Sequence, residues 1–197
     1  FRREGPSLTL KKIDAVVGRG ARRGPVRGTA HCRLDTHEYG AGGTTGFDPN
    51  ALLPILTRNQ ARTIRALDFS GGPPETRFEV SGNFDNPKLF RLEGHAQGTN
   101  FSYNGASIVS FDSGLSVSNG VLTFSPVTAV REEGRAAGLV AIDFDNEKVE
   151  IDATSTCDPY MIGRIIGPNF EKFLRTFRFE GPTRVTARGR VDYSGAA

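Results

Sequence analysis

The feature of this 197-residue sequence that most constrains its fold is a passage that occurs twice, 110 positions apart. Residues 28–71 and 138–181 align without a gap and share 10 identities in 44 pairs, against roughly 3 expected by chance for average residue usage. The identical pairs are Gly28/Gly138, Asp35/Asp145, Thr44/Thr154, Asp48/Asp158, Pro49/Pro159, Ile55/Ile165, Asn59/Asn169, Arg65/Arg175, Phe69/Phe179 and Gly71/Gly181. An internal repeat predicts an architecture built from similar units laid side by side.

The repeat divides the chain into three parts: a basic leading strand or loop over residues 1–27, a first unit over 28–137 and a second, partial unit over 138–197. Beyond Gly71 a three-residue deletion restores the alignment and lays residues 78–85 over 185–192. A chain of this length that folds as an ordinary globular body buries about 70% of its unfolded surface. We therefore expect a sizeable core that needs no disulfide staples.

Most of the sequence predicts short β-strands. Apolar and polar residues alternate between positions 76 and 153, with the apolar residues at Phe78/Val80, Phe101/Tyr103, Val109/Phe111, Leu115/Val117, Leu122/Phe124, Ile142/Phe144 and Val149/Ile151. Turn signals such as Asn104-Gly105 and Asn119-Gly120 separate these runs. The alternation predicts an antiparallel meander with one apolar face and one face of Ser, Thr, Arg, Asp and Glu.

The repeated passage also predicts helices. Asp48 and Asp158 are suitable N-cap residues, and each is followed by a proline at the first helical position. Apolar residues then recur at helical spacing, but Pro54 and the Gly167-Pro168 pair predict a break in each helix, because an internal proline removes a backbone donor. The expected fold is β-rich α+β: a meander sheet with short broken amphipathic helices, forming either an open groove or a sandwich.

Positive charge is concentrated at the start of the chain. Residues 1–33 carry nine Lys/Arg against Glu4 and Asp14, so this segment is +7 while the remainder is −4. Such a segment could contact anionic lipid headgroups or nucleic acid, or it could be a solvated strand and loop with ordinary surface arginines. No aromatic residues are interleaved with the basic run to stack on bases, so we do not expect nucleic acid as a partner.

The sequence shows little that would support catalysis or metal binding. Cys32 and Cys157 lie outside any metal-ligand spacing and align with apolar residues in the repeat, which favours buried free thiols over a bridge between them. His31 and His37 fall near a predicted hairpin and His95 in a glycine-rich turn, so we expect exposed histidines that share no carboxylate. Motifs for a nucleophile or a phosphate-binding loop are absent from the sequence, and we expect a non-enzyme without cofactor or metal.

Two phrases carry a resemblance to a known family: PETRFEVSGNFDNPKLFRLEGHAQG over residues 74–98 and FEGPTRVTARGRVDYSG over 179–195, each following an Asp-Pro helix. In this pattern of short predicted strands separated by glycines and aspartates, the chain from about residue 28 to 194 resembles the AsmA-like family of bacterial envelope proteins, of the AsmA/TamB type. The resemblance implies an apolar β-groove in the bacterial periplasm, tethered to a membrane by a segment outside this sequence. It further implies phospholipid transport between membranes or outer-membrane assembly, with phospholipid, a membrane surface or envelope proteins as partners.

The resemblance also implies which residues would bind lipid. They are apolar residues of the central strands, which should form one continuous strip because alternate residues of neighbouring strands line one face of a sheet. These candidates are Phe101, Tyr103, Phe111, Leu115, Val117, Leu122, Phe124, Ile142, Phe144, Val149 and Ile151. A site for acyl chains needs no polar constellation, since each methylene gains about 0.8 kcal/mol on leaving water.

Two other interpretations fit the same residues. In the first, the two repeat units pack face to face as a structural β-sandwich, the apolar positions form its core, and its loops bind a polysaccharide or a protein partner. In the second, the broken helices are an interface for oligomerisation. The sandwich and the groove differ in whether the apolar face is covered, which alternation alone does not determine.

Overall fold

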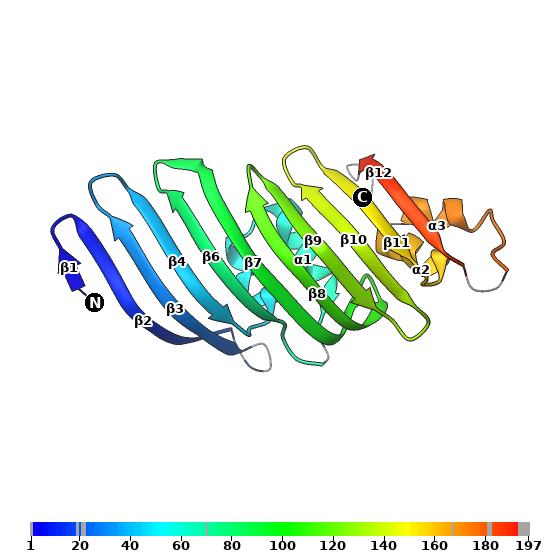
Figure 1. Cartoon of the computed structure of the whole chain (residues 1–197), viewed down its shortest axis with the longest axis horizontal. Coiled ribbons are helices and arrows are strands. Elements are labelled where there is room, and N and C mark those ends of the chain that lie inside the picture. The colour runs from blue at the N-terminus through cyan, green and yellow to red at the C-terminus, as the bar shows by residue number, and fades with distance from the viewer. Residues whose placement is uncertain are drawn as a thin grey trace.

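The computed structural model describes residues 2–18, 20, 23–69, 71–166, 168–180 and 183–192. Within them, eleven strands follow one another in chain order across one open antiparallel sheet, and the short β5 pairs with the end of β7 (Figure 1). The strands are β1 Arg2–Glu4, β2 Ser7–Val17, β3 Gly24–Arg33, β4 Glu38–Thr45, β5 Leu67–Asp68, β6 Glu75–Asn83, β7 Asn86–Tyr103, β8 Ala106–Ser118, β9 Val121–Val130, β10 Arg135–Asp143, β11 Lys148–Ser155 and β12 Val185–Asp192. The predicted β-rich meander is confirmed.

The sheet forms a single layer, so the sandwich alternative is wrong. Each strand pairs with the strand before it and the strand after it, and β1 and β12 lie at opposite ends of the molecule (Figure 1). A sandwich requires strands that cross between two packed sheets, whereas this order is an uninterrupted meander. Hairpin turns connect most neighbouring strands, and the two longer connections, from β4 to β6 and from β11 to β12, carry the helices and return the chain to the next position in the same sheet.

The single layer leaves the molecule with a large surface. Its accessible surface is 12429 Å², whereas a globular monomer of 21.3 kDa is expected to expose about 9,100 Å². The buried apolar residues in the described part of the chain are Ala61, Phe101, Ala106, Ile108 and Cys157. The expectation of a sizeable core is therefore wrong, because a sheet with no second layer cannot remove either of its faces from water.

Two predicted Asn-Gly turns connect the central strands. Asn104 and Gly105 have φ angles of 49° and 73° between β7 and β8, and Asn119 and Gly120 have φ angles of 51° and 74° between β8 and β9. Asn and Gly tolerate this left-handed conformation better than other residues, and two consecutive positive φ angles produce the turn that matches strand twist. These dipeptides therefore set the register of the longest hairpins.

Four short helices lie on one side of the sheet: η2 Pro49–Ile55, α1 Arg58–Arg65, α2 Pro159–Ile166 and α3 Pro168–Leu174 (Figure 1). The predicted caps are present, since Asp48 and Asp158 each accept a hydrogen bond at 2.9 Å from the backbone N–H two residues on. The predicted breaks are present as well, although the first helix is 3-10 and contains Pro54. In the described residues, no helix has the length and apolar character to span a bilayer.

The two copies of the repeated passage pair their strands in the same register. Val26 of β3 pairs with Thr45 of β4, and Ala136 of β10 pairs with Ser155 of β11. Each residue of the second pair lies 110 positions after its equivalent in the first pair. Strand β4 and strand β11 also cover equivalent residues. The two passages therefore fold alike locally, although the unit boundaries at 27/28 and 137/138 fall inside β3 and β10. A duplication event stays a prediction.

The sequence alignment beyond the helices needs a correction. Gly43 pairs with Phe78, and Ala153, the equivalent of Gly43, pairs with Ala187. Phe78 therefore corresponds to Ala187 and not to Val185, as the three-residue deletion predicts. The error is two residues, which keeps every side chain on its face because strands have a period of two. Pairing with the preceding strand sets this register, and sequence identity over so short a strand does not reveal it.

Candidate functional site: the apolar face of the sheet

One face of the sheet carries a row of apolar residues that are paired strand by strand. Directly paired residues in an antiparallel sheet point to the same face, so the pairing places the whole row together. This first apolar row, from β2 to β11, consists of Leu10, Ala30, Ala41, Val80, Leu92, Val117, Leu122, Ile142 and Val149. The row crosses the strands and is not interrupted by a charged residue.

A second apolar row lies beside the first. It consists of Ile13, Gly28, Gly43, Phe78, Gly94, Leu115, Phe124, Val140 and Ile151. Glycines stand on both sides of Phe78 in this ladder, and a Cβ on Gly43 or Gly94 would lie 2.0 or 2.2 Å from a backbone oxygen. The backbone of the neighbouring strand therefore occupies the space that a side chain would need at these two positions.

Most of the residues predicted to bind lipid lie on this face. Val117, Leu122, Ile142 and Val149 belong to the first row and Leu115, Phe124 and Ile151 to the second. Phe111 contacts Phe124 edge to face, with ring centroids 5.9 Å apart. Phe144 lies in the turn after β10, where its N–H donates to the carbonyl of Gly120, and so extends beyond the paired strip.

Phe101 and Tyr103 reach the same face through a change in the alternation of β7. From Phe90 to Gly98 every second residue of β7 is half-buried, but the next residue with low exposure is Phe101, three positions after Gly98. Between them, Asn100 has a φ of 51° in the left-handed region. The Phe101 ring accordingly lies against Phe111, with centroids 6.1 Å apart. A local backbone conformation, and not strict alternation, brings the end of β7 onto the apolar face.

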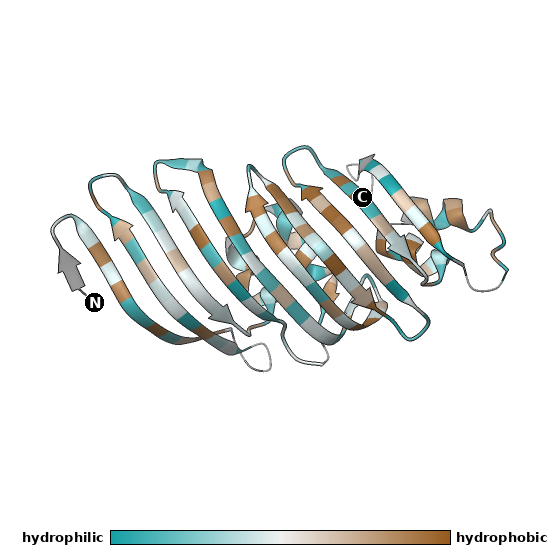
Figure 2. Ribbon diagram, in the orientation of Figure 1, coloured by the Kyte–Doolittle hydropathy of each residue, from teal (hydrophilic) through white to brown (hydrophobic). Residues whose placement is uncertain are grey.

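The apolar face is largely uncovered. No residue in either row is fully buried: all are half-buried except Leu10, which is 38% exposed. Half-burial is what flanking strands alone provide to a side chain on a single-layer sheet. Figure 2 shows the brown apolar residues alternating with polar ones along the strands, with helices behind part of the sheet only. A row of partly accessible apolar side chains is a candidate binding surface.

The helices cover the apolar face near the β7–β8 turn. There the Phe69 ring stacks on Phe101 at 5.5 Å, and Phe101 and Ile108 are buried. Burial raises the pKa of the Tyr103 hydroxyl, while the nearby Arg62 guanidinium of α1 lowers it. The Asn104 amide donates to the Ile165 carbonyl at 3.4 Å, which connects α2 to the same turn. The small buried core therefore lies where the helices meet the sheet, and the residues of both apolar rows outside it are only partly buried.

The opposite face is polar and carries ion pairs between neighbouring strands. Arg188 of β12 lies 2.6 Å from Asp152 of β11, and Arg190 lies 2.8 Å from Glu150. These carboxylates raise the pKa of both guanidinium groups, first through hydrogen bonds and then through their charge. Because the groups are exposed, each pair contributes little stability. They nevertheless distinguish the water-facing side of the sheet from the apolar side.

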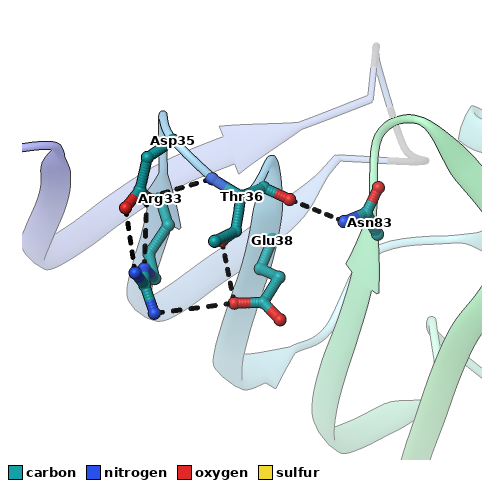
Figure 3. Close-up of polar contacts among 5 residues, drawn as sticks. All are labelled: Arg33, Asp35, Thr36, Glu38 and Asn83. Atoms are coloured by element: carbon teal, nitrogen blue, oxygen red, sulfur yellow. Dashed lines mark hydrogen bonds and ion pairs between the residues drawn. The ribbon is translucent and has the colours of Figure 1, made fainter.

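The tips of two hairpins on the same edge are joined by polar contacts (Figure 3). Arg33 donates to both oxygens of Asp35, at 3.2 and 2.9 Å, and this pairing holds the pKa of Asp35 below its usual range. Thr36 donates to Glu38 at 2.9 Å, and the Asn83 amide donates to the Thr36 carbonyl at 2.7 Å. These contacts fix the spacing between β3–β4 and β6, where the sheet has no helical cover.

The histidines that contact a carboxylate do not share one. His37 contacts Asp85 and His95 contacts Asp112, so two histidines have a carboxylate partner, but each has a different one and all four side chains are about half exposed or more. His95 lies inside β7 and not in a turn as predicted, because Gly94 beside it pairs with Phe78 within the sheet and does not mark a turn. Among the described residues, no cluster of three or more potential ligands could hold a metal.

The cysteines are separate thiols. Cys32 is half-buried on the apolar face, opposite Leu8 and Tyr39, and Cys157 is buried just before α2. The structure thus agrees with the expectation of free thiols, although only Cys157 is fully buried. Neither lies within a polar constellation that would activate it.

Sequence reasoning missed the first half of the strip. Leu10, Ala30, Ala41 and the glycines of β3 and β4 belong to the face, but small residues give a weak alternation signal. The pattern Val26, Gly28, Ala30, Cys32 against Arg27, Thr29, His31, Arg33 does alternate with a period of two and could have extended the strip to β3.

Comparisons with known proteins leave the family open. No family model matches the chain, and searches of curated proteins and of solved structures also give no significant match. The functional interpretation therefore depends on the geometry of the apolar face.

Proposed function

We infer that the apolar face binds the acyl chains of phospholipids, and that the chain is a periplasmic segment of an AsmA-like envelope protein that transports phospholipid between membranes or supports outer-membrane assembly. The observation that carries the proposal is the open double row of apolar residues from β2 to β11. Phospholipid and membrane surfaces are the proposed partners, with envelope proteins as further partners. The proposed role involves no catalysis.

The dimensions of the face suit lipid chains. Neighbouring strands are about 4.8 Å apart, so the eight steps from β2 to β11 span about 38 Å. The hydrocarbon core of a bilayer is about 30 Å thick, so one leaflet contributes chains of about 15 Å. The rows are therefore long enough for two acyl chains in sequence, and a row that crosses every strand offers no barrier to movement along it.

The chemistry of the face also suits transport. Each acyl methylene gains about 0.8 kcal/mol when it leaves water for an apolar surface, and this gain does not depend on position along a uniform row. Charged side chains next to the rows point to the opposite face, for example Glu93 and Arg91 beside Leu92 in β7. An acyl chain on the apolar face would thus be shielded from water on one side, and no single position along the row would bind it more tightly than the others.

The test uses two adjacent residues of β9 that point to opposite faces. Leu122→Glu places a carboxylate in the first apolar row, and Thr123→Glu places the same charge on the polar face between Ser116 and Ala141. Leu122→Glu should keep the fold, with a loss of about 1 kcal/mol of stability, because the site is only half-buried. It should also abolish bound lipid, whereas Thr123→Glu should retain it.

Lipid is measured by native mass spectrometry and by organic extraction of protein purified from a bacterial host, with a thermal melt of each variant alongside. Equal lipid content in the two folded variants, or no lipid on the parent protein under any gentle purification, would sink the proposal. A Leu122→Glu variant that does not fold would be replaced by Leu122→Asn, judged by the same comparison.

A further inference from the structure

The helices after β11 end in an aromatic cluster whose members lie outside the paired strands. Ring centroids lie 6.0 Å apart for Phe170 and Phe173, 5.2 Å for Phe173 and Phe177, 6.4 Å for Phe177 and Phe179, and 5.4 Å for Phe179 and Tyr160. The Tyr160 hydroxyl donates to the Phe177 carbonyl at 2.6 Å, which fixes the segment after α3 against α2. Tyr160 of α2 therefore holds the cluster in place, through this hydrogen bond and through its contact with Phe179.

Two members of the cluster point to water. Phe173 is 54% exposed and Phe177 is 49% exposed, and the two rings contact each other. The first copy of the repeat has Thr63 and Leu67 at the equivalent positions. Because the same two-helix arrangement forms without this exposed aromatic pair, folding does not require it.

The surroundings of the pair are basic. Residues 159–180 contain Arg164, Lys172, Arg175 and Arg178 against Glu171 and Glu180, a net charge of +2. Arg178 is 90% exposed, and Lys172 is exposed beside Phe173. Exposed phenyl rings surrounded by Lys and Arg are typical of elements that lie in the interface of an anionic membrane, where the rings enter the headgroup region and the cations meet phosphate.

We propose that Phe173 and Phe177, with Lys172 and Arg178, dock this end of the molecule onto an anionic phospholipid bilayer. The proposal goes beyond lipid binding on the sheet, since it concerns the surface of the bilayer and a different set of residues. Helix α2 follows β11 directly and contacts the β7–β8 turn, so docking here brings the bilayer to the covered end of the apolar face.

Cosedimentation with vesicles tests the docking surface. The parent protein should bind vesicles of phosphatidylcholine containing phosphatidylglycerol, bind pure phosphatidylcholine vesicles less, and lose affinity as salt increases. Lys172→Glu/Arg178→Glu should weaken binding to the anionic vesicles at least about 30-fold, at roughly 1 kcal/mol for each lost cation. Phe173→Ser/Phe177→Ser should weaken binding to both vesicle types.

Matched controls separate the site from general effects. Phe84→Ser removes another aromatic residue, 67% exposed, in the β6–β7 turn, and Arg58→Glu/Lys88→Glu makes the same change of charge elsewhere. Both controls should bind anionic vesicles nearly as the parent does, and thermal melts should show all variants folded. Binding by the Phe173/Phe177 variant equal to the parent's, or a parent that binds no vesicles, would overturn the proposal.

Two further outcomes are informative. If size-exclusion chromatography shows a dimer that the Phe173/Phe177 variant converts to monomer, the pair is an interface between copies and the docking proposal fails. Failure of docking is distinguishable from failure of the proposed function, because the lipid content of the purified protein reports only on the sheet. We expect the Phe173/Phe177 variant to retain bound lipid and Leu122→Glu to retain vesicle docking.

Discussion

At the scale of the residue, the apolar face combines apolar side chains with glycines at positions where a neighbouring backbone lies too close for a Cβ. Gly43 lies on this face beside Phe78, and a Cβ there would approach the Arg27 carbonyl oxygen to 2.0 Å. Its neighbour Gly42 lies on the polar face, where a Cβ would meet its nearest atom, on Glu79, at an ordinary 3.5 Å. The two adjacent glycines therefore have different roles.

Alanine substitution should separate these roles. Gly43→Ala should lower the free energy of unfolding by about 1–3 kcal/mol, because the backbone of β3 must move to admit the methyl group. Gly42→Ala should change it by less than about 0.5 kcal/mol, or raise it slightly by restricting the unfolded chain. Urea unfolding monitored by circular dichroism gives both values. Equal effects of the two substitutions would contradict the role assigned to Gly43.

At the scale of the element, one carboxylate ties the helix pair together. Glu171 of α3 accepts a hydrogen bond from Arg175 at 2.7 Å and lies 3.7 Å from Arg164 of α2. The hydrogen bond from Arg175 and then the charges of both arginines hold the pKa of Glu171 below its usual value. The two short helices are thereby joined: α2 ends at Ile166, α3 begins at Pro168, and neither is long enough to be stable alone.

This pairing predicts a pH dependence. Since the pKa of Glu171 is lower in the folded than in the unfolded state, its contribution to stability is present above the unfolded value and is lost as pH falls through the folded value. Glu171→Gln should therefore melt at a lower temperature than the parent at neutral pH, and the difference should shrink on acidification. Thermal melts across pH 3 to 7 measure it, with Glu180→Gln as an exposed control. A difference that stays constant with pH would rule out the ion pair as its cause.

At the scale of the whole molecule, the sheet is nearly one-dimensional. Each strand contacts its two neighbours, and the buried core lies under the helices around β7 and β8. In such an array stability is a sum of units and their interfaces, so opening can begin at the ends. Removal of a terminal strand would cost one interface and leave the rest of the array paired.

Amide hydrogen exchange should reveal this organisation. We expect the slowest exchange in β7, β8 and β9 and progressively faster exchange toward β2 and β12, because the end strands have a partner on one side or lie far from the core. Mass spectrometry of peptides from each strand gives the gradient. Uniform protection from β2 to β12 would indicate a single cooperative unit and would contradict the one-dimensional description.

The sequence by itself determined the local features of this protein. Period-two alternation placed Leu115, Val117, Leu122 and Phe124 on one face, Asn-Gly pairs placed the hairpins, and Asp-Pro pairs placed the helix starts. Each of these signals acts between residues that are close in the chain, where sterics and hydrogen bonding decide the conformation. The same local logic failed for His95, since a glycine in a strand resembles a glycine in a turn.

Only the tertiary structure decided whether the apolar face is covered. A sandwich and an open sheet have the same alternation, and they differ in whether distant strands fold back on one another, a property that no local pattern encodes. The position of Phe101 was also decided there, by the left-handed backbone of Asn100, and so was the equivalence of Phe78 with Ala187, by pairing between strands. The open face and the equivalence of Phe78 with Ala187 depend on contacts between segments that are remote in sequence, whereas the position of Phe101 depends on a backbone conformation that alternation does not reveal. The open face is therefore a property of the whole sheet and not of any one strand.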